Sequence, residues 1–293
     1  MKFTKTLLIA ACLSIAASAN AEDTLKKIKD SGKITMGVRE SSAPLSYLDA
    51  NQQPIGYHID ICKAIIEDIK KKIGAPALKT EIQAVTSQNR IPLMTNGTID
   101  IECGSTTNSV ARQKQVAFAY TTFVSNVRMA VKKPSGITSL AQLDGKPVAT
   151  TQGTTSVALM RGNEKSKNID FKEVYGKDHA DSFLMLENDR AVAFVMDDNL
   201  LAGLIANSKS PLLFHIVGET LSTEPIGIMM RKDDPEFKKI ADATIARMMK
   251  SGEIDKLYAK WFMSKVPPKN VALNFEMSAE LKALIKNPND KGI

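Results

Sequence analysis

Three arginines stand close to hydroxyl-bearing residues in the first half of the chain. Arg39 precedes Ser41-Ser42, and Arg90 and Arg112 flank the run Gly104-Ser105-Thr106-Thr107. An arginine keeps its proton, and its planar fork matches a carboxylate with two parallel hydrogen bonds. Hydroxyls and glycine amides can satisfy the oxygen lone pairs that the forks leave over. The pattern therefore predicts a site for a small ligand with two negative charges.

The second half of the chain adds a Gly-hydroxyl turn and a pair of acids. Gln152-Gly153-Thr154-Thr155-Ser156 follows an expected strand and opens a helix, without the spacing of a nucleotide-binding loop. Asp197 and Asp198 follow another strand, at the edge where α/β proteins bind ligands. One Asp can pair with an ammonium group while the other caps the next helix. Spacing does not decide between them, and we prefer Asp197. The alternative for both segments is helix capping alone.

The first 21 residues have the layout of a secretory signal. Two lysines precede a short apolar stretch at 6–15, and Ala19-Asn20-Ala21 matches a cleavage site. We expect cleavage after Ala21 and a periplasmic protein. The segment Ile9-Ala10-Ala11-Cys12 also resembles a lipobox, so lipid anchoring at Cys12 is the alternative.

Composition excludes several classes of protein. No later stretch reaches the roughly 18 apolar residues of a membrane span. The net charge is +7, but the lysines are dispersed among acids, which is not the basic stripe of a nucleic-acid-binding protein. We therefore expect no nucleic-acid partner. We also expect the protein to be a monomer. Aromatic residues make up 5% of the chain, with one Trp, which argues against a sugar-binding platform.

Two cysteines remain once the signal is removed. Cys62 and Cys103 form an even number in an oxidising compartment, which favours a disulfide, with two separate buried thiols as the alternative. Neither lies in a CxxC pair, and the three His are scattered. We expect no metal and no cofactor.

Strands and helices alternate along the chain, which predicts an α/β protein with largely parallel sheets. The expected strands are 33–38, 78–84, 99–103, 128–131, 146–150, 171–175, 191–196, 215–217 and 227–231. The expected helices are 24–29, 59–72, 89–95, one opening at 109–113, 157–162, 178–188, 199–207, 235–251, 253–262 and 278–286.

The elements divide into two units. We expect residues 22–127 and 224–293 to form lobe 1 and residues 128–223 to form lobe 2. The chain would cross between the lobes twice, near 126–129 and 223–227. A cleft between two lobes is a common place for a ligand.

Several segments resemble the periplasmic amino-acid-binding proteins of ABC importers, over essentially the whole exported chain. They are Arg39-Glu40-Ser41-Ser42, Thr86-Ser87-Gln88-Asn89-Arg90-Ile91-Pro92-Leu93, Glu102-Cys103-Gly104-Ser105-Thr106-Thr107-Asn108, Lys177-Asp178-His179, Ala191-Val192-Ala193-Phe194 and Met196-Asp197-Asp198. The likeness is greatest to members that bind glutamate and aspartate. It implies a two-lobed periplasmic-binding-protein fold of type II, with a two-strand hinge, and ABC permease subunits as partners.

The resemblance also implies roles for individual residues. The position of Arg112 clamps the ligand α-carboxylate, and Asp197 takes the α-ammonium. The cage of the α-groups is completed by Ser105, Thr107 and Thr155. The side-chain carboxylate is read by Arg39, Arg90, His179 and Ser87. L-glutamate and L-aspartate both suit this set, and one methylene is too small a difference to rank them.

An enzyme on the same scaffold is the alternative, because periplasmic dehydratases of cyclic carboxylates are similar to this fold. Such an enzyme needs a poised general acid or base. The candidates are Glu102, Asp197 and His179. Few acids are expected in the cleft, which argues against this alternative.

Overall fold

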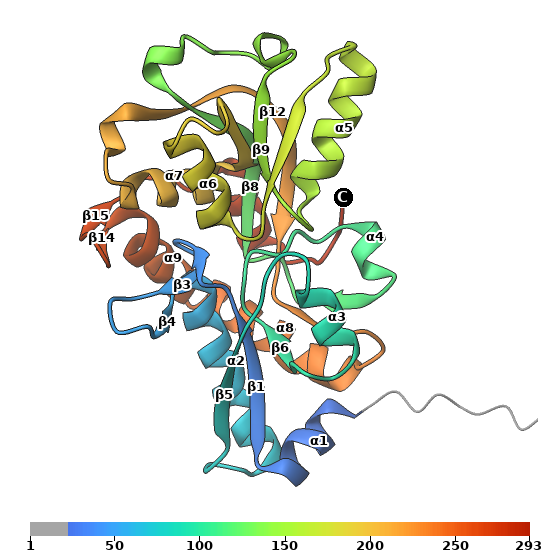
Figure 1. The fold of residues 1–293 in the computed structure, drawn as a ribbon. Coiled ribbons are helices and arrows are strands. Elements are labelled where there is room, and N and C mark those ends of the chain that lie inside the picture. The colour runs from blue at the N-terminus through green and yellow to red at the C-terminus, as the bar shows by residue number, and fades with distance from the viewer. Residues whose placement is uncertain (1–22) are drawn as a thin grey trace, which may run out of the picture.

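Two five-stranded sheets organise the computed structural model, which describes residues 23–293. Figure 1 shows the sheets one above the other, with the first sheet in the lower half. The expected signal segment and Cys12 lie outside the described residues. None of the helices within 23–293 is long and apolar enough to cross a bilayer.

The first sheet has the strand order β5-β1-β6-β13-β7. Its strands are β1 (Lys33–Val38), β5 (Lys79–Ala84), β6 (Ile101–Glu102), β7 (Val116–Phe118) and β13 (Met229–Arg231). The helices around it are α1 (Thr24–Ser31), α2 (Tyr57–Ile73), α3 (Arg90–Thr95), α4 (Val110–Gln113), α8 (Pro235–Lys250), α9 (Glu253–Tyr258) and α10 (Ala279–Lys286). A small sheet of β2 (Ser41–Ser42), β3 (Ser46–Leu48) and β4 (Pro54–Ile55) adjoins it.

Helix α2 illustrates how the sequence builds this unit. Ile61, Ile65 and Ile69 recur at helical spacing and are fully buried. The helix ends at Gly74, whose φ of 66° is the left-handed conformation that glycine adopts at little cost. Its buried face packs against α8, which returns from the far end of the chain.

The second sheet has the strand order β10-β9-β11-β8-β12. Its strands are β8 (Phe123–Lys132), β9 (Pro147–Thr151), β10 (Lys172–Gly176), β11 (Ala193–Asp197) and β12 (Phe214–Ile226). Its α-helices are α5 (Thr155–Lys167), α6 (His179–Glu187) and α7 (Asp198–Asn207). The α/β class predicted from the alternating pattern is confirmed.

One strand in each sheet runs against the others. Strand β13 is antiparallel to β6 and β7, and β8 is antiparallel to β11 and β12. Asp197, which ends β11, is opposite Val127 near the start of β8. Glu102, which ends β6, is opposite Met229 at the start of β13. The antiparallel strand of each sheet therefore begins at the edge where the parallel strands end, and residues that follow the parallel strands face the boundary between the sheets.

Strands β8 and β12 form a long antiparallel ribbon at that boundary. Ser125 is opposite Glu224 in the ribbon, and the register shifts between Val217 and Ser222. Beyond the ribbon, Thr107 of the first unit forms a bridge with Ile226. The two crossings expected from the sequence thus lie in paired strands. The lobe limits at 127/128 and 223/224 stay a prediction.

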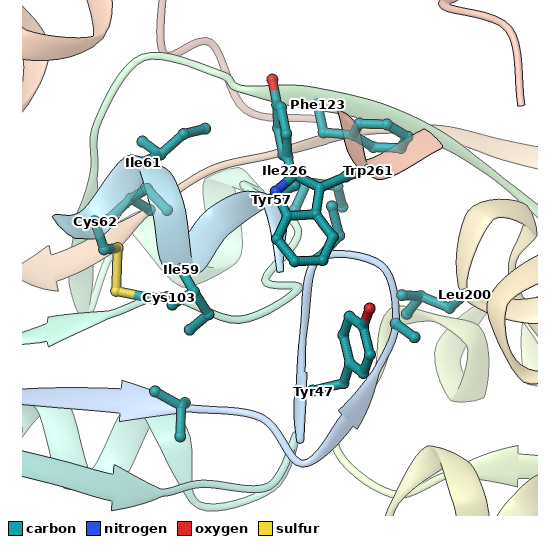
Figure 2. Close-up of a cluster of buried hydrophobic side chains, with 14 of the residues drawn as sticks. Tyr47, Tyr57, Ile59, Ile61, Cys62, Cys103, Phe123, Leu200, Ile226 and Trp261 are labelled. Atoms are coloured by element: carbon teal, nitrogen blue, oxygen red, sulfur yellow. A yellow bond between two sulfur atoms is a disulfide. The ribbon is translucent and has the colours of Figure 1, made fainter. Parts of the chain in front are cut away.

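An aromatic cluster and a disulfide stabilise the first unit where it meets the ribbon (Figure 2). Phe123 of β8 stacks on Phe262 with ring centroids 4.9 Å apart. Cys62 of α2 is bonded to Cys103, with Cα atoms 6.2 Å apart, so the predicted disulfide is confirmed. Because Cys103 comes directly before the Gly104–Thr107 run, the disulfide ties that run to the buried helix α2.

Candidate ligand site

The candidate residues come together where strands of both sheets end. In the first unit they follow β1, β5 and β6: Arg39, Ser87, Arg90, Ser105, Thr107 and Arg112. In the second unit they follow β9 and β10 or end β11: Thr155, His179 and Asp197. Arg112 and Thr155 are half-buried, and the other seven are buried. Which of them touch a ligand stays a prediction.

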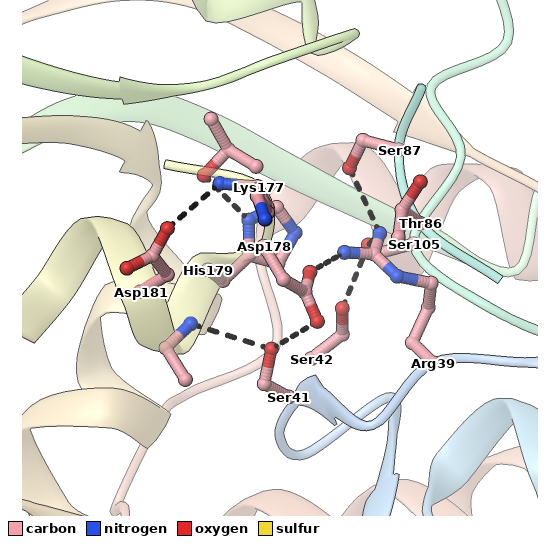
Figure 3. A network of polar contacts seen from close by, with 12 residues as sticks. Arg39, Ser41, Ser42, Thr86, Ser87, Ser105, Lys177, Asp178, His179 and Asp181 are labelled. Atoms are coloured by element: carbon pink, nitrogen blue, oxygen red, sulfur yellow. Dashed lines mark hydrogen bonds and ion pairs between the residues drawn. The ribbon is translucent and has the colours of Figure 1, made fainter. Parts of the chain in front are cut away.

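Arg39 is paired with a carboxylate of its own chain. Its Nη1 donates to Ser87 Oγ at 3.0 Å, and its Nη2 bonds Asp178 Oδ1 from the second unit (Figure 3). Ser41 Oγ donates to Asp178 Oδ2 at 2.6 Å. Although burial acts in the opposite direction, the charge of Arg39 and these hydrogen bonds lower the pKa of Asp178 to about 2. The positive charge of Arg39 is therefore already balanced.

Arg90 has no such partner. Its side chain is 2% exposed, Nη1 donates only to the carbonyl of Ser105 at 3.3 Å, and Nε has no hydrogen bond. No carboxylate oxygen of residues 23–293 lies within ion-pairing distance of it. Burial, and then the neighbouring charge of Arg112, lower the pKa of Arg90 to about 9. A buried charge is costly unless it is paired, so this guanidinium favours an anionic ligand.

Arg112 connects the two units and, within residues 23–293, forms no ion pair with a carboxylate. Its Nη1 donates to the carbonyl of Thr107 at 2.8 Å, and its Nη2 donates to the carbonyl of Gly153 at 3.2 Å. Burial lowers its pKa. The helix expected to open here is the single turn α4, capped by Ser109 Oγ, which accepts from Arg112 N at 3.3 Å. One turn gives little helix dipole, so the guanidinium itself supplies the charge.

Glu224 was missed by the sequence reasoning. It lies on β12, is 1% exposed, and its Oε2 accepts from Thr107 at 2.6 Å and from Thr155 at 2.8 Å. Its Oε1 has no hydrogen bond. The two threonines expected to surround a ligand thus bond one carboxylate of the chain, which joins both units to the ribbon. Its place at the expected second crossing was the only signal in the sequence.

Asp197 presents an open carboxylate. It is 4% exposed, and Oδ1 has no hydrogen bond. Burial, followed by the charges of Glu224 and Asp198, raises its pKa well above the ordinary range. Asp198 instead accepts from the backbone of Asn126 at 3.1 Å and of Asn199 at 2.8 Å. Of the two acids, Asp197 is the one free to meet a cation, which agrees with the choice made from the sequence.

His179 stands beside the arginines as a neutral group. Its Nδ1 lies 3.0 Å from Thr151 Oγ1, and the side chain is buried. Burial, together with the positive charge of Arg39, lowers its pKa to about 3. A neutral imidazole can donate one hydrogen bond to a ligand without adding charge.

Acids are more numerous here than we expected. Glu102, Asp197 and Glu224 are buried near the arginines, and Asp178 is largely covered. The expectation of few acids in the cleft was wrong, because Asp178 reaches the site through its ion pair with Arg39 and Glu224 enters it from the ribbon. Glu102 accepts from Thr106 Oγ1 at 2.7 Å. Among residues 23–293, no cluster of His, Cys, Asp and Glu suits a metal ion.

Comparison with known proteins decides the family. Residues 34–264 match the model of the bacterial extracellular solute-binding proteins, family 3. The chain belongs to this family. It is 49% identical to a glutamate/aspartate import solute-binding protein of Escherichia coli K12, over 98% of this chain and 97% of that one. It is also 47% identical to an L-glutamate/L-aspartate-binding protein of Pseudomonas aeruginosa, over 98% and 95%.

Solved structures of similar proteins agree with the family 3 assignment. An ancestral arginine-binding protein bound to glutamine has 30% sequence identity and a TM-score of 0.70, covering 79% of this chain and 98% of that one. The predicted periplasmic-binding-protein fold of type II is confirmed.

Proposed function

We propose that the chain is the periplasmic substrate-binding component of an ABC importer, that it binds L-glutamate or L-aspartate, and that it delivers the ligand to the membrane permease. One observation carries this proposal. Arg90 is buried and Arg112 half-buried, and neither has a carboxylate partner among the described residues, while Asp197 is a buried carboxylate with an oxygen that accepts no hydrogen bond. An acidic amino acid supplies the complement, two carboxylates and one ammonium.

The geometry favours a particular orientation of the ligand. Arg112 and Asp197 would hold the α-carboxylate and α-ammonium, with Ser105 and Thr107 nearby. Arg90 and His179 would meet the distal carboxylate, beside Ser87. Arg39 is already paired with Asp178. We therefore assign mainly to Arg90 the recognition of the negative charge on the distal carboxylate of the ligand. The names of the two relatives, which specify glutamate and aspartate, support this assignment.

Closure of two lobes around the ligand follows from the proposal. The ligand would touch Arg90 and Arg112 on one side and Asp197 and His179 on the other. The paired strands β8 and β12 would act as the hinge. Ligand binding stabilises the closed form only through contacts that the open form lacks, and residues of both lobes provide them.

Titration calorimetry with L-glutamate, L-aspartate and L-glutamine tests the function. We expect tight binding of at least one of the two acids, with the ligand recovered unchanged, and much weaker binding of glutamine. Turnover of a prephenate-like acid would favour the dehydratase alternative instead. Equal binding of glutamine and glutamate would contradict the proposed reading of the distal carboxylate.

A further inference from the structure

The last residues of the chain lie beside the loop that carries Arg112. After α10, residues 287–293 return to the first sheet, and Figure 1 shows this end close to α4. Ile293 N donates to the carbonyl of Asn108 at 3.2 Å, and Val110 N donates to the main-chain oxygen of Ile293 at 2.8 Å. These two bonds pair the segment with residues 108–110 as one strand pairs with another.

Side-chain contacts strengthen the same pairing. Asn108 Nδ2 donates to the carbonyl of Asp290 at 2.8 Å, and Gln113 Nε2 donates to the same oxygen at 3.0 Å. Gly292 fits closely, because a Cβ there would lie 3.0 Å from backbone atoms of Ser109 and Val110. The segment therefore contacts both ends of α4.

The opposite side of the loop is held by the ribbon. Asn108 N donates to the carbonyl of Pro225 at 2.8 Å, and Gly227 N donates to the carbonyl of Thr106 at 3.2 Å. The loop of residues 106–110 is thus hydrogen-bonded to β12 on one side and to the C-terminal segment on the other. Removing one neighbour would leave it bonded along one side only.

Anchors outside the loop hold the C-terminal segment in place. Thr121 N donates to the carbonyl of Asn289 at 2.9 Å. Lys238 of α8 pairs with Asp290 Oδ2 at 2.9 Å. The segment is therefore fixed to the first unit before it reaches the loop.

We propose that residues 290–293 are a positioning segment, which holds Arg112 in the orientation that ligand binding requires. The inference rests on the proposed function, in which Arg112 clamps a carboxylate. A four-residue helix cannot maintain itself in isolation, because helix nucleation is unfavourable. The direction of Arg112 therefore depends on what packs around α4. A shift of the Arg112 guanidinium by about 1 Å would weaken its oriented hydrogen bonds to the ligand carboxylate. Loss of the segment therefore lowers ligand affinity.

Deletion of residues 290–293 from the full chain is the test. We expect the affinity for L-glutamate, measured by calorimetry, to fall about tenfold or more. Lys286→Ala on α10 is the control, because Lys286 is exposed and outside the segment. Gly292→Val keeps the chain length but crowds Ser109, and it should weaken binding in the same direction. Circular dichroism identifies a variant that has failed to fold.

A double-mutant cycle separates positioning from general destabilisation. In the Arg112→Lys background the fork is absent, so the deletion should change affinity by less than about twofold. Amide exchange without ligand adds a second measurement: Val110 N–H should be protected in the intact protein and exchange faster after the deletion.

Three results would overturn the inference. They are an unchanged affinity after the deletion, an equal loss in both backgrounds, or a Val110 amide that exchanges freely in the intact chain. If the intact chain bound neither acid, the proposed function would fail together with the role of Arg112. Normal binding by the deleted chain would reject the positioning segment alone.

Discussion

Asp178 and Arg39 form an ion pair between the two units, with Ser41 donating a second hydrogen bond to the same carboxylate. A carboxylate of the protein is thus paired with Arg39, the guanidinium that the resemblance expects to bind the side-chain carboxylate of the ligand. This contact needs no ligand, so under the proposed closure we expect it to favour the closed arrangement by itself. We therefore expect Arg39 and Arg90, to which the resemblance gives the same role, to have different tasks.

Asp178→Asn should favour opening of the ligand-free protein. The substitution leaves Arg39 buried without its anion, and because Asp178 is partly exposed we expect the closed form to lose about 1–2 kcal/mol. Small-angle scattering without ligand should give a larger radius of gyration. Asp181→Asn in the first turn of α6 is the control, because among the described residues Asp181 accepts only from the backbone of Lys177. The same radius in both variants would contradict the role of the ion pair.

Arg90→Gln should reduce the selectivity for charge. In the parent protein we expect glutamine to bind more weakly than glutamate by on the order of 2–5 kcal/mol, since an amide leaves a buried guanidinium without an anion. The variant should lose most of its glutamate affinity and much of that preference. Arg128→Gln removes a charge outside the site and should change neither. Calorimetry with both ligands measures the effect, and a full preference retained by Arg90→Gln would reject the assignment.

Arg112→Ala and Asp197→Ala should abolish binding of every amino acid, because α-groups are common to all of them. Asp198→Asn is the comparison for the acid, since Asp198 is bonded to Asn126 and Asn199 rather than left open. A variant of Arg112 or Asp197 that kept aspartate binding within about tenfold, or roughly 1.4 kcal/mol, would show that its residue does not hold an α-group.

His58 should make stability depend on pH. It bonds the Gly104 carbonyl and Thr122, and burial lowers its pKa to about 4. Between pH 4 and 6.5 the unfolded state binds the proton that folded His58 does not, so the free energy of unfolding falls as the pH falls. The slope is up to about 1.4 kcal/mol per pH unit, and His179 acts in the same direction. Urea unfolding at pH 7 and pH 5 should show a smaller difference for His58→Asn than for the parent. Equal differences would contradict this.

Removal of the disulfide should destabilise the protein without reshaping it. Cys62 and Cys103 are 41 residues apart in the sequence, and loss of such a cross-link costs about 2–4 kcal/mol. The double variant Cys62→Ala, Cys103→Ala should therefore unfold at lower urea concentration, with an unchanged far-ultraviolet spectrum. A thiol assay on the unfolded parent that begins at Glu22, without Cys12, should detect no free cysteine; two reactive thiols would show that the bridge is absent in solution.

Much of the fold was predictable because its elements carry local signals. The helix expected at 235–251 is observed as Pro235–Lys250, since proline opens it and Ser251-Gly252 follows it. Strand β12 was expected only at 215–217 but extends over Phe214–Ile226. Its residues are mostly half-buried or exposed, so the apolar alternation of an ordinary strand is absent. Pairing with β8, a tertiary contact, defines this strand.

In the candidate site, too, features with a local signal were predictable and long-range contacts were not. The position of Asp197 at the end of β11 was predictable because the sheet determines where an acid at the end of a buried strand lies. The partners of Asp178 and Glu224 were not found, because Arg39 is 139 residues from Asp178 and Thr107 is 117 residues from Glu224. The pairing of Ile293 with Asn108 was missed for the same reason. No local pattern encodes contacts between segments so far apart.

The ribbon of β8 and β12 gives this fold a property useful for protein engineering. Ser125 and Glu224 are neighbours across the ribbon, so the chain leaves the first sheet and comes back at one place. The segment between Ser125 and Glu224 is therefore joined to the rest of the chain at two adjacent positions, as an inserted domain would be. We expect that it could be exchanged for the corresponding segment of another family 3 protein, producing chimaeras in which each half of the cleft comes from a different parent.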